Sequence, residues 1–596
     1  MKKEIVVLLI GFFSYIPFAN SQSNAINISL KQSEALPHES VFVHFNTSLF
    51  LAGESLYYKV YCLNVETSKF STLSKIAYVE LIGEKHEVVF KHKIKLDSGI
   101  GFGDFTIPVS IFSGNYKLIA YTHWMQNVGE DYFFKRNISI INPFQSNQQT
   151  ILVDSNDNAI NQSKDSNSIL NLKSIHQTQE IINSQFLEIA INRKKFKKRD
   201  QVSLTLRSIY EENIAGNYSI SIRKISALDD LVDKAVSAKS FKNTLKSKTI
   251  ILSEINYLPE LRGELISGKL IRLSDNKPAT NEKVSISIQE KDFILKVSNT
   301  NKEGIFYFSI NNDYYSENAF LQVLDKKNGD YKITLNSHRP IDYSSLDFGK
   351  LKISSSFKSL LEERSIYNQI ENGYFSLKKN TLKAIDVITP FFGDYFATFY
   401  LDDYTRFSKV KETFVEIITN AYIKRDTKHS FNFYVTSLNP YERDEKPAGV
   451  VVDGVLLQNF DEFLEYDSRK IIRISIARTE TNFKLGSKTF GGFIVVETID
   501  GNFYKELVKE NITTVKLFKP QPLKEYYKKI YISNLETDRI PDFRNQLLWE
   551  PNVKMIGKEM NFNFFTSDIV GTYEICVEGF TANGNPVSIR EFIIVE

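Results

Sequence analysis

Alternation of apolar and polar residues with a period of two is the feature that most limits what this chain can fold into. Residues 284–288 read VSISI and residues 218–222 read YSISI. Successive side chains of a strand point to opposite faces, so such segments predict strands with one buried and one polar face. Many short strands separated by Gly, Asn and Asp turns are typical of antiparallel sandwiches. We therefore expect tandem antiparallel β-sandwich domains.

Composition narrows the class of protein. Hydrophobic residues make up 42% and charged residues 24% of 596, which excludes a wholly disordered chain. The net charge of +3 is too balanced for a dedicated nucleic-acid binder. Two cysteines exclude a disulfide scaffold, and we expect Cys62 and Cys576 to be separate buried thiols.

The N-terminus has the three parts of a secretory signal. Lys2 and Lys3 precede an apolar run, and Ala19 and Ser21 supply small residues before a cleavage site at residue 21. No other stretch of about 18 apolar residues follows, and no Cys follows the site for a lipid anchor. We expect an exported chain that is soluble after cleavage, with no transmembrane segment and roughly four domains in its remaining length.

A Gly-x-Tyr turn recurs three times, ending in Tyr116, Tyr218 and Tyr573. A tyrosine at such a corner can bury its ring and bond its hydroxyl to the backbone. Three copies predict three sandwich modules of related type.

Two segments stand out against the β pattern as helices. Residues 360–374 mix apolar and charged positions, and between residues 407 and 421 apolar residues fall on one helical face. Asp402 and Asp403 precede the second helix, where they are better interpreted as caps than as a catalytic pair.

Residues 45–60 and 103–122 resemble the macroglobulin-2-type domain of the alpha-2-macroglobulin family, with a shorter match at 186–225. That family traps proteases with a Cys-Gly-Glu-Gln thioester. Leu63 follows Cys62 and Val577 follows Cys576, so this activity does not transfer. The resemblance implies a modular β-sandwich outside the cytoplasm.

Residues 262–325 resemble a transthyretin-like, carboxypeptidase-regulatory domain, through the segments ISGKL at 266–270 and NKEGIF at 301–306. That resemblance implies a structural or docking module without catalysis.

Residues 447–501 resemble the plug of TonB-dependent outer-membrane receptors of the SusC/RagA type. PAGVVVDGV at 447–455 matches its strand and turn, and GGFIVVET at 491–498 its closing strand. The segment at 486–488 departs from the family pattern. Only 95 residues follow Gly501, too few for a 22-strand barrel. The order of domains is similar to a group of exported Bacteroidota proteins. The predicted fold class is thus mainly β: tandem antiparallel β-sandwich domains plus one small α/β plug-like domain.

The predicted layout has eight parts. They are a signal peptide (1–21), a macroglobulin-2-like sandwich (22–144), a Ser/Asn-rich linker (145–183), a second macroglobulin-like sandwich (184–258), a carboxypeptidase-regulatory-like sandwich (259–345), a helical connector (346–382), the plug-like domain (383–505) and a C-terminal sandwich (506–596).

No motif in the sequence indicates chemistry. The eight His form no metal frame, no Gly-x-Ser-x-Gly elbow is present, and Gly486-Ser487-Lys488-Thr489 lacks the spacing of a phosphate loop. We expect no catalytic residue, cofactor or metal. The hypothesis is a non-enzymatic periplasmic accessory of an outer-membrane transport or secretion complex, with an outer-membrane β-barrel protein as partner and no nucleic acid. The alternative is a cell-surface adhesin or glycan-binding protein.

The candidate interaction residues lie in the plug-like segment. They are Asp453 and Gly454 at its turn, and Gly491 and Gly492 before its last strand. Plain turn chemistry explains the same four residues, and both interpretations stay open at this stage.

Overall fold

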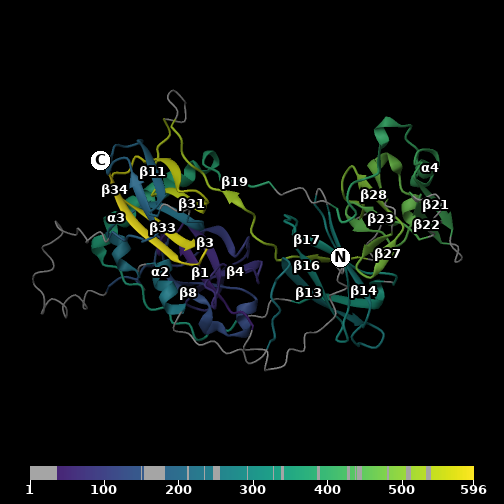
Figure 1. Ribbon diagram of the computed structural model, residues 1–596, viewed down its shortest axis with the longest axis horizontal. Coiled ribbons are helices and arrows are strands. Elements are labelled where there is room, and N and C mark those ends of the chain that lie inside the picture. The colour runs from purple at the N-terminus through teal and green to yellow at the C-terminus, as the bar shows by residue number, and fades with distance from the viewer. Residues whose placement is uncertain are drawn as a thin grey trace, which may run out of the picture.

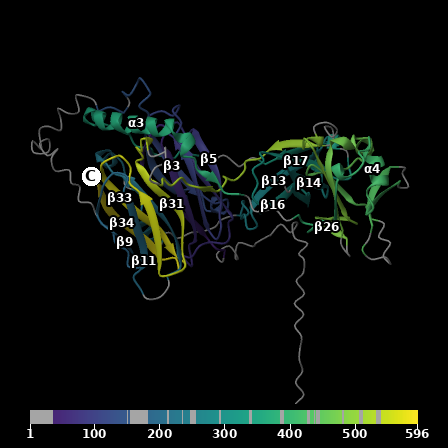
Figure 2. The ribbon, with the colours of Figure 1, turned by 90° about the horizontal axis from the view of Figure 1, so that it is seen from above.

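The computed structural model has two lobes side by side (Figures 1 and 2). It describes residues 36–596 except 150, 154–180, 211–213, 234, 246–254, 291–292, 327, 337–340, 385–389, 426–429, 437, 439–445, 479–481, 505–511 and 532–538. The predicted signal peptide and most of the predicted linker therefore lie outside the described residues. In the part of the chain described, no helix is long and apolar enough to cross a membrane.

The first sandwich is built from residues near the N-terminus. One sheet has the order β1 (Glu39–Phe45), β3 (Ser55–Asn64), β6 (Ile100–Thr106). The other has the order β2 (Leu49–Leu51), β8 (Phe134–Ile141), β7 (Gly114–Tyr121), β4 (Ile76–Gly83), β5 (Val88–Lys95). Tyr58 of β3 contacts Phe90 and His92 of β5 in the core between them.

The second sandwich joins segments that are more than 300 residues apart. Its five-stranded sheet has the order β10 (Lys195–Phe196), β34 (Pro586–Val595), β33 (Gly571–Thr581), β12 (Gly216–Lys224), β31 (Gln546–Met555). Its three-stranded sheet has the order β32 (Glu559–Phe565), β11 (Gln201–Ser208), β9 (Leu187–Ile191). We call it the discontinuous sandwich.

This pairing corrects the predicted layout. The separate sandwiches expected at 184–258 and 506–596 are one domain, because β12 lies between β31 and β33 and pairs with both. The segment 187–224 supplies only four strands, one of them two residues long, which cannot cover both faces of a core. The C-terminal strands complete it.

The three Gly-x-Tyr copies therefore do not mark three modules. Tyr218 of β12 and Tyr573 of β33 belong to neighbouring strands of one sheet. Tyr116 and Tyr573 donate their hydroxyls to the backbone oxygens of Phe112 and Ile569, at 2.8 and 2.9 Å, as expected. The buried Tyr218 hydroxyl has no hydrogen-bond partner among the described residues.

A third sandwich forms the start of the other lobe. Its sheets are β16 (Ile305–Ile310), β13 (Glu264–Arg272), β18 (Tyr331–Leu335), and β15 (Ile294–Asn299), β14 (Lys283–Ile288), β17 (Asn318–Val323), β29 (Thr513–Lys516). Strand β29 arrives from beyond residue 500, so the chain between β18 and β29 leaves this sandwich and returns to it.

Much of that intervening chain is an α/β unit, residues 397–503. Its mixed sheet has the order β20 (Ala397–Tyr400), β25 (Ile471–Ala477), β28 (Phe493–Thr498), β23 (Gly449–Val452), β24 (Val455–Leu456). Helices α4 (Val410–Glu416) and α5 (Asp461–Leu464) and the hairpins β21 (Ala421–Arg425)–β22 (Phe431–Val435) and β26 (Phe483–Leu485)–β27 (Lys488–Phe490) complete it.

Helix α4 is shorter than its apolar stripe predicts. It ends at Glu416, and Ile417 and Ile418 lead into the turn before β21. The expected caps were also wrong. Asp402 lies in a 3-10 turn and pairs with Arg406, whereas Glu412 accepts the N–H of the N-cap residue Lys409 at 3.3 Å.

Two further helices belong to the first lobe. Helix α2 (Ala238–Leu245) packs on the discontinuous sandwich, and α3 (Lys358–Gly373) lies along the outside of the lobe (Figure 2). The position of α3 agrees with the predicted helix at 360–374. The short strands β19 (Thr381–Leu382), which follows α3 in the chain, and β30 (Lys524–Glu525) pair with each other.

Candidate functional site: a cleft between two sandwiches

The predicted turn residues hold the α/β unit together and dock it on the third sandwich. The Asp453 carboxylate accepts the Thr498 N–H at 2.8 Å, the Thr498 hydroxyl at 2.6 Å and the Phe503 N–H at 3.1 Å. Its backbone oxygen accepts the Gln289 amide at 2.7 Å. This carboxylate is therefore occupied inside the chain.

The three glycines are required by close approach. Gly454 has a φ of 82°, and a Cβ there would lie 2.8 Å from the Cβ of Phe293. A Cβ on Gly491 would meet the Lys446 oxygen at 2.5 Å, and one on Gly492 would meet the Val435 Cβ at 2.5 Å. Local geometry accounts for all four predicted residues, and their role toward a partner stays a prediction.

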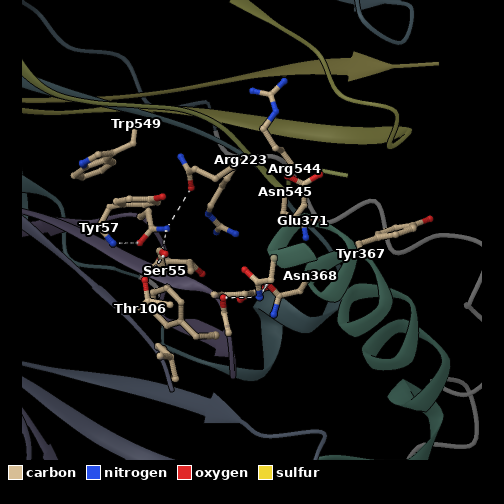
Figure 3. A pocket seen from close by; sticks show the side chains of 18 of the residues that line it. Ser55, Tyr57, Thr106, Arg223, Tyr367, Asn368, Glu371, Arg544, Asn545 and Trp549 are labelled. Carbon is tan, nitrogen blue, oxygen red and sulfur yellow. Dashed lines mark hydrogen bonds between the residues drawn. The ribbon is translucent and has the colours of Figure 1, made fainter. Parts of the chain in front are cut away.

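A large cavity lies in the other lobe. It is a cleft of about 920 Å³ between the first sandwich, the discontinuous sandwich and α3. Strands β3 and β6 supply Ser55, Tyr57 and Thr106, and strand β31 supplies Trp549. Figure 3 shows Tyr57 and Trp549 on one side of the cleft and Tyr367, Asn368 and Glu371 of α3 on the other.

Polar contacts hold α3 in place as a wall of the cleft. The Arg364 guanidinium donates to both carboxylate oxygens of Glu54, at 2.7 and 2.8 Å. Asn368 donates its amide to the Ala52 oxygen at 2.9 Å. Burial alone would lower the pKa of Arg364, but the Glu54 carboxylate raises it above its usual value. The pair therefore stays charged and fixes the helix to the β2–β3 turn.

Aromatic rings line both sides of the cleft. Tyr57 stacks on Trp549, with centroids 6.0 Å apart and planes at 21°, and Tyr526 meets Tyr57 edge-on at 5.1 Å. On the opposite side, Tyr367 stacks on Phe543 at 4.6 Å and 12°. Burial, together with the Asp104 carboxylate, raises the pKa of Tyr57 to about 12. Its hydroxyl is therefore protonated at neutral pH.

We call the residues that line the cleft its wall, and most cations of the wall are paired with carboxylates. Five of them form pairs at 2.6–2.9 Å: Arg223–Asp229, Arg364–Glu54, Lys378–Glu371, Lys524–Asp104 and Arg544–Asp542. The remaining two are Lys224, whose pKa is lowered by burial, and the exposed Lys379. The cleft is thus a polar and aromatic surface whose charges largely cancel.

In the described ranges, no three His, Cys, Asp or Glu side chains are grouped to hold a metal ion. The two cysteines are buried thiols without a disulfide, as expected, and burial raises the pKa of both. Trp124 lies in a 3-10 helix, and Trp549 is buried in β31.

Sequence reasoning missed the cleft because its walls come from four distant parts of the chain. Tyr57, Arg223, Tyr367 and Trp549 meet only once β31 has paired with β12. The one sequence feature that could have indicated the cleft is the group of aromatic residues around position 545. We interpreted that segment only as part of a sandwich.

Comparisons with known proteins add little to this geometry. No protein-family model matches the chain, and no curated protein matches its sequence. Among solved structures, Salmonella alpha-2-macroglobulin reacted with methylamine matches at 8% identity and a TM-score of 0.22, over 94% of this chain and 39% of that one. Escherichia coli alpha-2-macroglobulin activated by porcine elastase matches at 8% and 0.23, over 94% and 44%.

The E. coli adhesin FdeC matches at 11% identity and a TM-score of 0.14, over 31% of this chain and 48% of that one. Bacterial macroglobulins and bacterial adhesins are thus among the structural neighbours. The chain spans about two fifths of the length of the macroglobulins. Superpositions this loose carry no argument about activity or partners.

Proposed function

We propose that this protein is an exported, non-enzymatic interaction protein that binds its partner or ligand in the cleft between the first and discontinuous sandwiches. The observation that carries the proposal is the cleft itself. A concave site with aromatic walls and a few convergent polar groups is the usual form of a binding site. Its volume of about 920 Å³ lies at the upper end of the range of about 300–1,000 Å³ for such sites.

The setting we propose is the periplasm, where the protein would be an accessory of an outer-membrane transport or secretion complex. The signal-like N-terminus supports export. The likeness of residues 447–501 to a receptor plug supports a β-barrel protein as partner. The cell surface is the alternative location, and protease treatment of intact cells separates the two.

Filling the cleft tests the proposal. Asn545→Trp puts a large ring into the cleft, whereas Asn583→Trp puts the same ring on an exposed turn outside it. Tagged full-length protein is crosslinked in cells and purified from outer membranes, and its partners are identified by mass spectrometry. We expect Asn545→Trp to lose a partner that Asn583→Trp keeps. Equal recovery by both variants would refute binding in the cleft.

A deletion tests the accessory role separately. Removing residues 383–505 takes away the α/β unit and leaves every described wall of the cleft in place. Loss of a stoichiometric barrel partner in this variant supports docking through that unit. Retention of the partner, or absence of any barrel partner from the full chain, speaks against the accessory role.

A further inference from the structure

We propose that the ligand of the cleft is a neutral oligosaccharide. This inference rests on the proposed function, since it names the chemical class that the same cleft takes. It follows from the charges, the backbone groups, the ring faces and the free polar groups of the wall.

The charge pattern favours a neutral ligand. The pair between Arg364 and Glu54 and the pair between Lys524 and Asp104 are both bidentate, so their charges are already satisfied. An anionic ligand would have to compete with these carboxylates for the same N–H groups. Of the wall cations, only Lys224 and the exposed Lys379 hold no carboxylate among the described residues.

Part of the backbone in and beside the wall is already hydrogen-bonded to side chains, which leaves fewer groups for strand addition by a peptide. Strand addition needs a row of unpaired N–H and C=O groups. Here side chains of the wall already donate to six carbonyl oxygens, three on residues that line the cleft and three on residues next to them. The donors and acceptors are Arg364 to Leu49, Asn368 to Ala52, Asn372 to Gly53, Asn46 to Ser55, Arg544 to Leu547 and Gln546 to Leu548.

Ring faces offer what a sugar needs for stacking. A pyranose ring has apolar C–H faces and hydroxyls around its rim. The negative face of an aromatic ring attracts such C–H groups, and its flat area is buried without loss of side-chain freedom. Tyr367 and Phe543, stacked and half-buried, and Tyr57 across the cleft provide faces on two sides (Figure 3).

Besides the buried Trp549 Nε1 and the amines of Lys224 and Lys379, two polar groups of the wall have no hydrogen-bond partner in the described part of the chain. They are the Asn545 carboxamide and the Tyr527 hydroxyl, both on half-buried residues. A carboxamide offers a donor and an acceptor side by side, which matches two neighbouring hydroxyls of a sugar. Asn545 therefore has hydrogen-bonding capacity to spare inside the cleft, and it is the residue on which we base the test.

The test is an array of neutral and anionic oligosaccharides probed with the full exported chain, followed by calorimetric titration of each hit. We expect neutral hits only. Asn545→Ala should weaken their binding about five- to tenfold, as expected for the loss of hydrogen bonds to a ligand. Tyr367→Ala should weaken it by a similar factor through the lost ring face. The matched control Asn583→Ala removes an exposed amide outside the cleft and should leave affinity unchanged.

Each other outcome overturns the inference. Anionic hits alone, no hits, or neutral hits that Asn545→Ala and Tyr367→Ala both leave unchanged contradict a neutral saccharide in the cleft. If no saccharide binds while Asn545→Trp still loses a protein partner in cells, the ligand class is wrong and the proposed function stands. If both experiments are negative, the proposed function fails as well.

Discussion

At the scale of residues, ionisable groups lie fully buried in the contact between the first and discontinuous sandwiches. Lys59 donates to the Asn217 carboxamide and to the Tyr218 oxygen, and burial lowers its pKa well below the usual value. The His44 Nδ1 and the Ser219 hydroxyl oxygen are hydrogen-bonded at 2.6 Å. Burial, together with the Lys59 ammonium, lowers the pKa of His44 to about 3. These buried polar groups stabilise the contact only when each of them is hydrogen-bonded, because an unpaired buried polar group is costly.

Glu578 makes this contact dependent on pH. Its carboxylate accepts the Ala238 N–H and the Ser588 hydroxyl, both at 2.7 Å, with Arg590 as the neighbouring cation. Burial raises its pKa from 4.5 to about 7. Between pH 4.5 and pH 7 the Glu578 carboxyl is therefore protonated in the folded state and ionised in the unfolded state. The stability that Glu578 contributes is fully present below pH 4.5 and is lost as the pH rises through 7.

We predict that Glu578→Gln removes this loss, because the amide carries no charge to bury. The difference in unfolding free energy between pH 5 and pH 8, on the order of 3 kcal/mol from this group, should largely disappear. Urea unfolding at pH 5, 6, 7 and 8 measures it. Glu559→Gln, an exposed carboxylate of the same sandwich, is the control. An unchanged pH dependence in Glu578→Gln would contradict the assignment.

At the scale of elements, α3 is held by polar contacts as well as by the packing of Leu360 and Leu361 on an apolar cluster that includes Leu49. Its buried residues are Ser365 and Asn368, and Ile366 is exposed. The Arg364–Glu54 pair and the Asn368 amide attach it to the turn between β2 and β3. A few specific polar bonds therefore contribute to holding this wall of the cleft in place.

We predict that Arg364→Leu loosens α3. The change leaves the Glu54 carboxylate poorly solvated without its partner, at a cost of about 3 kcal/mol. Amide hydrogen exchange over residues 358–373 should become faster. Lys358→Leu breaks an exposed pair with Glu362 on the same helix and should cost less than about 0.5 kcal/mol. Equal exchange in the two variants would argue against this account of α3.

The sequence was a good guide to single elements. Period-two alternation identified strands such as β12 and β14, and α3 was predicted nearly to its ends. The end of α4 was missed, because an apolar stripe continues from Ile417 to Ala421 although the last of these residues opens a strand. The local pattern of apolar residues indicates which face of an element is buried, but it does not indicate where the backbone turns.

At the scale of the whole molecule, the chain closes on itself. The strands between 546 and 595 complete a sandwich begun at residue 187, and β29 completes a sandwich begun at residue 264. Pairing partners so far apart leave no local sequence signal, which is why the layout and the cleft could not be predicted while the mainly β class could. The cleft exists only because the C-terminal strands return to β12.

This topology predicts the behaviour of a truncated chain. A fragment ending at residue 540 loses both neighbours of β12, so the segment 187–224 should become open to proteases. Strands 39–141, which form two sheets of their own, should stay more resistant in the same fragment. Limited proteolysis with mass spectrometry measures both. Protection of 187–224 in the fragment would mean that this segment folds alone, against the structure.

The central claim, that the cleft is the binding site, has one direct measurement. A photo-crosslinking amino acid is placed at position 545 inside the cleft, or at position 583 outside it, in the full chain expressed in its own cells. The account predicts a discrete light-dependent adduct, protein or glycan, from position 545 and none from position 583. No adduct from position 545, or the same adducts from both positions, would contradict it.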